Sequence, residues 1–221
     1  VLAQQTDLSK FDYILHAEKD SKKYRPTLYD FLIHNALDFY KTSETNITKP
    51  AYAFSINDTK YLKEHTTFST LKIETKDSLS LQYNALKLYQ NLIKFHIRNK
   101  TLVALTEANL ERIQFVTSNA VFSDKNEMLL QCLQAEQKRI ESQPSSALYS
   151  YEIASLYRDQ STTYHPGKNE THRWKAKEAL ALCDAIIKKF PNSRGSDKCN
   201  ALKSQILQAT LNLKTEKHVP I

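Results

Sequence analysis

The side chains with the widest chemical range in this 221-residue chain are three cysteines and seven histidines. No two histidines stand four residues apart, the spacing at which one helix presents two zinc ligands. The chain also lacks a Cys-x-x-Cys pair, a Gly-x-Ser-x-Gly turn and a glycine-rich phosphate loop. We therefore predict no metal, no cofactor and no catalytic residue, and we interpret His96, on an apolar helix, as a core imidazole.

Two of the cysteines are predicted to face each other. Cys183 and Cys199 lie on consecutive helices joined by a short turn, at about 10 Å and about 5 Å of helix rise from it, a mismatch small enough for the two to meet. A structural disulfide there would close a loop of ~15 residues, contribute about 3 kcal/mol and imply an oxidising compartment. Two buried thiols are the equally weighted alternative, and Cys132 is interpreted as a small core residue.

Carboxylates and tyrosines give weaker signals. Glu107 and Glu111 share one helix face, but no Glu-x-x-His accompanies them, so a di-iron bundle is disfavoured and solvated charge is the simpler interpretation. Four tyrosines fall on one helix and its exit, where they could line a glycan or peptide groove or else pack between helical layers. They are Tyr149, Tyr151, Tyr157 and Tyr164.

Composition narrows the class of protein. Hydrophobic residues make up 41% and charged residues 25%, which is typical of a globular protein, and only two glycines are present, which disfavours sandwiches and barrels. The net charge of +7 is scattered along the chain beside acidic residues, so we predict no nucleic-acid partner. No apolar run is long enough to span a membrane, and we expect no membrane insertion.

The elements that position these residues are helical. From Arg173 to Phe190, apolar residues recur at steps of three and four, Pro191 ends the run, and a serine at 193 or 196 can cap a second helix with Cys199 and Leu202 on its inner face. The spacing of twelve residues between Ala179 and Pro191 matches the tetratricopeptide pattern, although most other positions of that repeat are absent. This hairpin predicts an all-α fold of stacked antiparallel helical hairpins, an irregular tetratricopeptide-like α-α superhelix.

Upstream, the same periodicity predicts further helices. In the helix that begins at Pro26, we expect Leu28, Phe31, Leu32, Ala36 and Phe39 to form the inward stripe. Residues 42–76 lack the pattern and are predicted to be a long irregular loop with a short helix near 59–64, serving recognition or, more simply, tethered by its aromatics. The other predicted helices cover 9–19, 77–98 capped by Asp77, 106–120 capped by Thr106, 124–140 capped by Asp124, and a run from Ser145 past Tyr157.

The predicted organisation is one helical domain over 1–210, followed by an extended segment. Leu211, Leu213 and Thr215 alternate with polar residues, which is the period of a β-strand. A lone strand is not stable, so 211–221 is expected to be a linker or strand leading into a β domain that follows in a longer parent chain.

Several segments resemble, in order, the N-terminal helical region of bacterial alpha-2-macroglobulin-like envelope proteins of the Bacteroidetes type. The resemblance covers about 24–220 apart from 42–76. The similar segments are Tyr24-Arg-Pro-Thr-Leu-Tyr-Asp-Phe-Leu, Leu86-Lys-Leu-Tyr-Gln-Asn-Leu-Ile-Lys-Phe-His96, Ala108–Val116, Tyr164-His-Pro-Gly167, Trp174–Cys183, Phe190-Pro-Asn-Ser-Arg-Gly195 with Cys199, and Leu211–Pro220.

The resemblance implies a non-enzymatic scaffold or interaction domain, exported to the periplasm or cell envelope, in a protein that restrains proteases. Its expected partners are proteins: the neighbouring β domains of the parent chain and proteases. The family's thioester motif, Cys-x-Glu-Gln, is not reproduced, since Cys132 and Gln137 are five residues apart, and no trapping residue is carried over. A free-standing glycan- or peptide-binding helical protein of the cell surface is the alternative.

Overall fold

The computed structural model describes residues 1–16, 18, 20–42 and 51–208. In these ranges the regular structure is helical, with only isolated β-bridges, which confirms the all-α prediction. The predicted strand at 211–221 lies outside the described residues. The helices are α1 (Leu2–Gln5), η1 (Leu8–Phe11), α2 (Ser21–Tyr24), α3 (Leu28–Tyr40), η2 (Thr59–Leu62), α4 (His65–Thr70), α5 (Leu81–Asn99), α6 (Leu102–Asn119), α7 (Lys125–Arg139), α8 (Ser146–Ser161), α9 (Lys175–Lys189) and α10 (Arg194–Leu207), where η marks a 3-10 helix.

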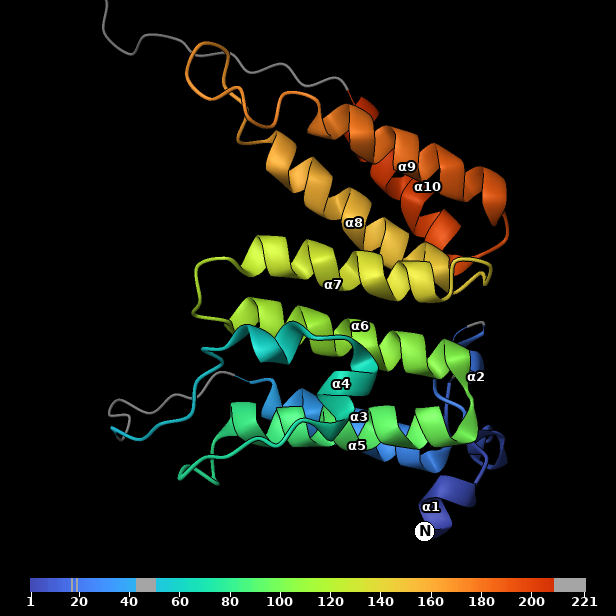
Figure 1. The fold of residues 1–221 in the computed structure, drawn as a ribbon. Coiled ribbons are helices and arrows are strands. Elements are labelled where there is room, and N and C mark those ends of the chain that lie inside the picture. The colour runs from blue at the N-terminus through green and yellow to red at the C-terminus, as the bar shows by residue number, and fades with distance from the viewer. Residues whose placement is uncertain (17, 19, 43–50, 209–221) are drawn as a thin grey trace, which may run out of the picture. The chain divides into compact units, whose positions relative to one another are not determined.

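The helices group into two compact units, which we call unit 1 (Val1–Tyr149) and unit 2 (from Ser150 onward). In unit 1, α5 packs against α6, α3 and α4 pack against α5, and α7 packs against α6 (Figure 1). In unit 2, α9 and α10 form an antiparallel hairpin. The prediction of one domain over 1–210 is not tested by this grouping and stays a prediction.

The C-terminal hairpin was predicted closely. Helix α9 ends at Lys189, just before Pro191, and the Ser193 hydroxyl caps α10 by accepting a hydrogen bond of 3.1 Å from the Ser196 amide. The surface between the two helices of the hairpin is formed by Ala179, Cys183 and Ile186 of α9 and by Cys199 and Leu202 of α10, all of them buried.

Two predicted caps were wrong. Asp77 does not begin α5. Its carboxylate instead accepts a 3.0 Å bond from the Phe54 amide, and Ser80 caps the helix three residues later. Thr106 lies inside α6, where its buried hydroxyl donates to the Leu102 carbonyl at 2.9 Å. Thr106 has a local alternative to a cap, whereas the partner of Asp77 lies 23 residues away in the chain, and sequence spacing distinguishes neither case from a cap.

The predicted helix at 9–19 was also wrong over its described part. Only the turn Leu8–Phe11 is helical, and it is a 3-10 turn capped by Asp7. The preceding main chain pairs with the start of α3 instead, because the Leu8 amide donates to the Pro26 carbonyl and the Leu28 amide donates to the Thr6 carbonyl. These bonds draw the backbone toward α3 and away from a longer helix.

Helix α3 buries the face opposite to the predicted one. Its buried residues are Asp30, Ile33, His34 and Leu37. Two members of the predicted inward stripe are exposed, Leu32 at 50% and Phe39 at 62%. The face with Asp30 and His34 is buried because these two polar residues find partners on other helices, at His96 and Glu111.

The irregular stretch after α3 is held tightly from residue 51 onward. The expected short helix is present as η2, and α4, which was not predicted, follows it. Ile56, Tyr61, Leu62 and Phe68 are buried, so aromatic and aliphatic side chains do tether the segment. We call residues 51–80 the tethered segment.

We expect Leu37→Ala to lower the free energy of unfolding by about 2–5 kcal/mol, since Leu37 is fully buried. Leu32→Ala is the same change on the exposed face of the same helix. It should lower the free energy of unfolding by less than about 0.5 kcal/mol. Urea unfolding followed by circular dichroism measures both. Equal losses would contradict the assignment of the faces.

Candidate functional site: a buried polar network in unit 1

The most unusual side chain in unit 1 is Arg112 of α6, which is completely buried. Its Nη1 donates to the carbonyls of Tyr61 at 2.8 Å and Lys63 at 3.1 Å, both in the tethered segment. Its guanidinium carbon lies 4.7 Å from the ring centroid of Phe68. A cation this deep is stable only when its donors are satisfied, so Arg112 and the tethered segment depend on each other.

Asn109 completes the setting of this guanidinium. Its side-chain oxygen accepts from Nη2 and Nε of Arg112 at 2.5 and 3.2 Å, one turn along the same helix. Its amide nitrogen donates to the Tyr149 hydroxyl at 2.8 Å. Burial raises the pKa of Tyr149 far above its usual range, so the phenol stays neutral as an acceptor.

Helix α5 contributes a second anchor for the tethered segment. The buried amide of Gln90 donates to the carbonyls of Phe68 at 2.8 Å and Leu71 at 2.7 Å, where α4 ends. The carbonyls at a helix end lack partners within the helix. Gln90 therefore does for the end of α4 what a capping group does, from another helix.

Glu136 of α7 meets the other end of α4. Its carboxylate accepts a 2.6 Å bond from the His65 amide and lies 2.7 Å from Nδ1 of the same histidine. Burial raises the pKa of Glu136, but the His65 hydrogen bonds and the nearby Arg112 charge outweigh it and hold that pKa below its ordinary value. The ionised carboxylate thus satisfies the His65 amide at the first turn of α4.

A second histidine–carboxylate pair joins α3 to α5. His96 Nε2 lies 2.9 Å from a carboxylate oxygen of the fully buried Asp30, and His96 Nδ1 lies 2.8 Å from the Thr101 hydroxyl. The other Asp30 oxygen accepts from the Thr27 amide in a capping box. Burial raises the pKa of Asp30, and the bonds from His96 and Thr27 bring it below its ordinary value. His96 is a core imidazole, as predicted.

A third pair joins α3 to α6. Glu111 lies 3.3 Å from His34 Nδ1, 3.1 Å from Arg25 and 3.7 Å from Lys41. Burial raises its pKa, while His34, Lys41 and Arg25 together lower it below the ordinary value. Glu107 lies 3.9 Å from the same arginine. The two glutamates therefore share a face as predicted, but they are paired across helices, and their interpretation as solvated charge was wrong.

Cys132, His65 and Glu136 are the residue types of a nucleophile, a base and an orienting acid. The thiol of Cys132 lies 3.9 Å from the Lys63 carbonyl, to which it donates, and burial raises its pKa. A nucleophilic cysteine needs a lowered pKa and access to substrate. With Cys132 at 5% exposure and His65 at 7%, this arrangement favours a core role, as predicted for Cys132.

In unit 2, the structure brings Cys183 and Cys199 together as buried thiols. The hydrogen bond between the two lowers the pKa of Cys183, and the same bond together with burial raises the pKa of Cys199. The pair is therefore placed as the sequence predicted, whereas their covalent linkage stays a prediction.

The tyrosine set does not gather on one open face. Tyr149 is buried in unit 1. In unit 2, Tyr151 and Tyr157 are half-buried and lie beneath the ammonium groups of Lys198 and Lys175, at 4.9 and 4.1 Å from the ring centroids. These contacts are typical of packing between helices, one of the two interpretations above.

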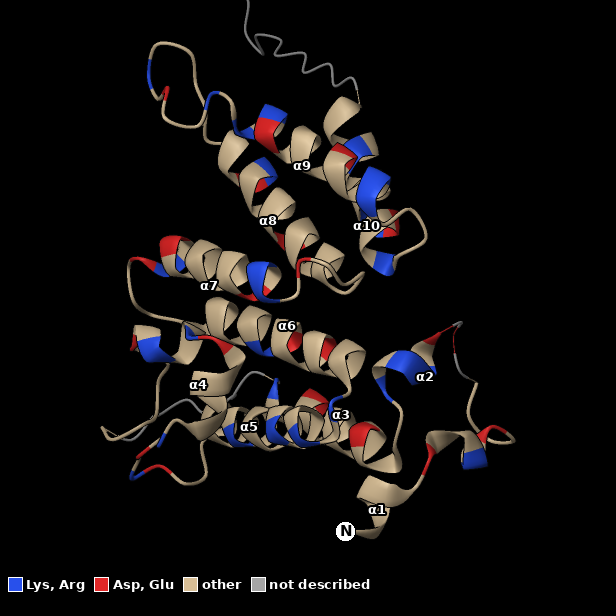
Figure 2. Ribbon diagram, turned by 45° about the vertical axis from the view of Figure 1, so that its right-hand side comes forward, with Lys and Arg blue, Asp and Glu red and all other residues tan. Residues whose placement is uncertain are grey.

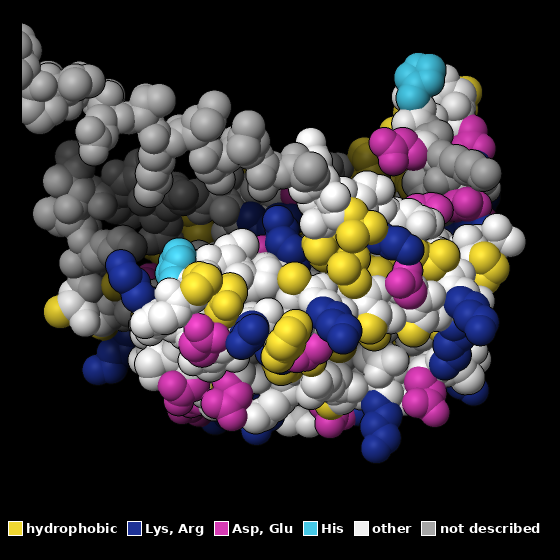
Figure 3. All heavy atoms as spheres, turned by 90° about the horizontal axis from the view of Figure 1, so that it is seen from above, with side chains coloured by type: hydrophobic (Ala, Val, Ile, Leu, Met, Phe, Trp, Pro, Cys, Tyr) yellow, Lys and Arg dark blue, Asp and Glu magenta, His cyan; other side chains and the backbone are white. Residues whose placement is uncertain are grey.

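The remaining candidates are dispersed. His16 and His165 are exposed, and His172 lies 2.8 Å from the Thr163 hydroxyl, while His218 is outside the described residues. Among the described residues, no three histidine, cysteine or carboxylate side chains cluster as metal ligands. Lysines and arginines are interspersed with acidic residues over the helices (Figures 2 and 3). No helix in the described ranges is long and apolar enough to cross a membrane.

Comparison of the chain with protein-family models, with curated proteins and with solved structures gives no match.

Replacing Arg112 with methionine keeps an unbranched apolar stem and removes the charge and the donors of the guanidinium. We expect Arg112→Met to lower the free energy of unfolding by about 3–5 kcal/mol, because the Tyr61 and Lys63 carbonyls lose their partner. Hydrogen exchange should quicken most in the tethered segment. Arg98→Met, at an exposed arginine, is the matched control and should change stability by less than about 0.5 kcal/mol. An Arg112 variant as stable as this control would contradict the anchoring role.

Three carboxylates, two of them buried and Glu111 partly so, predict acid sensitivity of unit 1. Asp30, Glu111 and Glu136 all have pKa values lowered by folding, so their contribution to stability is present above the unfolded pKa and is lost as pH falls through the folded one. We expect the urea midpoint to drop between about pH 5 and pH 3. Glu136→Gln should flatten this drop, and Glu74→Gln, at an exposed carboxylate, should leave its slope unchanged. Identical slopes in the two variants would count against Glu136.

Proposed function

We propose that this chain is a non-catalytic helical scaffold and interaction domain, built as an irregular tetratricopeptide-like superhelix, in an alpha-2-macroglobulin-like protein of the cell envelope. The observation that supports the scaffold role best is how unit 1 uses its buried polar groups. Arg112, Gln90 and Glu136 direct their donors and acceptors to the main chain of the tethered segment. Polar groups that are bonded to the main chain inside the unit rigidify the framework. The outer faces of the helices are then left for partners.

The alternative, a glycan- or peptide-binding surface protein, would need several tyrosines exposed on one face. Tyr149 is buried and Tyr151 and Tyr157 are half-buried under lysines, so this observation favours the scaffold. A second support for an interaction role is the exposed apolar face of α3. A protein partner is the simplest use of such a face.

The membership in this family is tested by the coding sequence downstream of Ile221. The proposal expects an open reading frame that continues into β-sandwich domains, reached through the alternating segment at 211–221. Incubation of the expressed parent protein with endopeptidases of differing specificity then tests protease restraint, with the 221-residue chain alone as the control. A stop codon directly after Ile221, or a continuation without β domains, would overturn the family assignment.

The exported location is tested by Cys183 and Cys199. In protein taken from its native compartment without reductant, we expect mass spectrometry to find the two cysteines linked, since the thiols already touch and oxidising compartments retain disulfides. Reduction should then lower the free energy of unfolding by about 3 kcal/mol. Cys132 is a buried thiol and should be alkylated only after denaturation. Fully reduced Cys183 and Cys199 in the native material would contradict export.

A further inference from the structure

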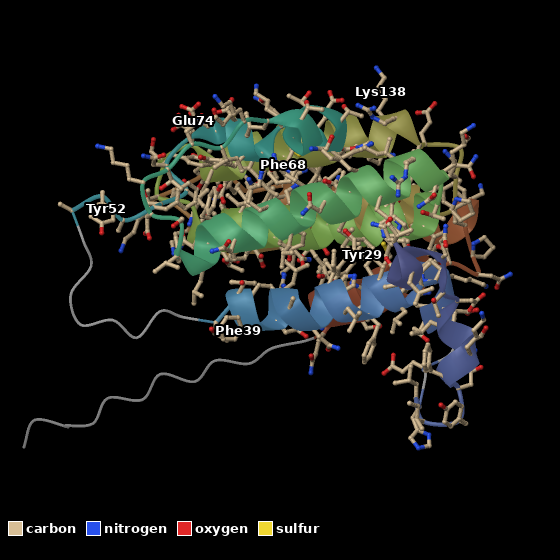
Figure 4. All side chains as sticks on the ribbon, turned by 90° about the horizontal axis from the view of Figure 1, so that it is seen from below. Tyr29, Phe39, Tyr52, Phe68, Glu74 and Lys138 are labelled. Atoms are coloured by element: carbon tan, nitrogen blue, oxygen red, sulfur yellow. The ribbon has the colours of Figure 1, made fainter. Side chains whose placement is uncertain are left out.

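Helix α3 has two faces that differ in what covers them. One face, centred on Leu37, packs into unit 1. On the opposite side, Leu32 and Phe39 are 50% and 62% exposed, and Leu28 is half-buried. Figure 4 shows α3 along an outer edge of unit 1, with Phe39 near the helix's C-terminal end. A surface helix normally turns charged residues to solvent, and a helix that is apolar on both sides is normally covered on both.

The exposed face has the spacing of a helix-packing seam. Leu28, Leu32, Asn35 and Phe39 follow one another at steps of four, three and four, which places them within a narrow stripe along the helix. This is the heptad spacing at which two helices pack side by side. Within these thirteen residues, only Asn35 interrupts the apolar character of the stripe.

The order of these steps, four, three and four, is the same from either end of the stripe. An antiparallel two-fold pairing of two such helices would place Leu28 opposite Phe39 of the second copy, and Leu32 opposite Asn35 of the second copy. Self-complementarity of this kind is the requirement of a two-fold interface, in which residue i contacts j and j contacts i. The Asn35 amides flank the two-fold axis, and each can both donate and accept a hydrogen bond.

The charges beside the seam do not oppose such a pairing. The exposed charge on α3 nearest the seam is Asp38, whose carboxylate lies 3.1 Å from Lys41 Nζ. At the other end, Arg25 is already paired with Glu107 and Glu111. The charges beside the seam are therefore paired within one copy, and two copies can approach without bringing uncompensated like charges together.

From these observations we propose that α3 is a homodimerisation helix, whose exposed seam is covered by the same seam of a second copy of this chain. Dimerisation through α3 goes beyond the proposed scaffold role, because a monomer could also act as a scaffold. The seam is about 17 Å long, eleven helical steps from Leu28 to Phe39. A single pair of helices in contact over that length buries less surface than the ~1,200–2,000 Å² of stable complexes, so the dimer is weak and depends on concentration.

Sedimentation velocity of the full 221-residue chain tests the dimer, over about a hundredfold range of concentration reaching high micromolar. We expect the weight-average mass to rise from monomer toward dimer and to stop there. The combined change Leu32→Lys and Phe39→Lys should weaken association at least about tenfold, because each copy would bury unpaired ammonium groups. Leu79→Lys is the matched control, since Leu79 is an 86% exposed leucine elsewhere in unit 1 and should leave association unchanged.

A cysteine substitution tests the antiparallel geometry separately. Because Asn35 lies next to the two-fold axis, the thiols introduced by Asn35→Cys should form an intermolecular disulfide under mild oxidation, whereas those introduced by Leu79→Cys should not. A chain that stays monomeric throughout, a dimer unaffected by the double lysine change, or assemblies that grow beyond two copies would each overturn the proposal. None of these outcomes bears on the family assignment, which the downstream sequence decides.

Discussion

Unit 1 depends on one buried cation. The Arg112 guanidinium is fully removed from solvent, and it bonds to two carbonyls of a segment that lies about fifty residues earlier in the chain. An arginine in that position without those carbonyls would be too costly to bury, and the carbonyls without the arginine would be unsatisfied. The irregular segment and the helical layers are therefore held together by shared buried hydrogen bonds.

The same arrangement recurs around Arg112. Glu136 supplies acceptors to the start of α4, Gln90 supplies donors to its end, and Asp30 links the cap of α3 to His96 on α5. Glu136 and Gln90 each act as a capping partner for α4 that the sequence next to α4 does not provide. This use of polar groups fixes which segments lie against which helix, since an apolar core alone tolerates sliding and rotation more readily.

Helix α3 connects this interior to the outside. Its inward face carries two ionisable residues, Asp30 and His34, together with Ile33 and Leu37. Because α5 and α6 offer partners for both ionisable groups, the helix turns that mixed face inward and leaves its more uniformly apolar stripe at the surface. An interaction surface thus arises as a consequence of how the core is satisfied.

Much of the architecture followed from local patterns in the sequence. Apolar residues at steps of three and four, with Pro191 and Ser193 as boundaries, were enough to predict α9, α10 and the meeting of Cys183 with Cys199. These predictions succeeded because the information is contained within one or two neighbouring helices. A sequence signal for the polar network was also present, in the polar residues Thr106, Asn109 and Arg112, which follow one another at steps of three along α6.

Only the tertiary structure decided which face of α3 is buried and what Arg112 binds. Periodicity identifies a stripe by its hydrophobicity, and it assigns no weight to a polar residue whose partner lies far away in sequence. Asp30 and His96 are 66 residues apart in number, and each is favourable inside only because the other is there. The sequence by itself therefore determined the long helices and the hairpin of α9 and α10, while the pairing of buried charges, which exists only once the chain has folded, determined which face of α3 is turned inward.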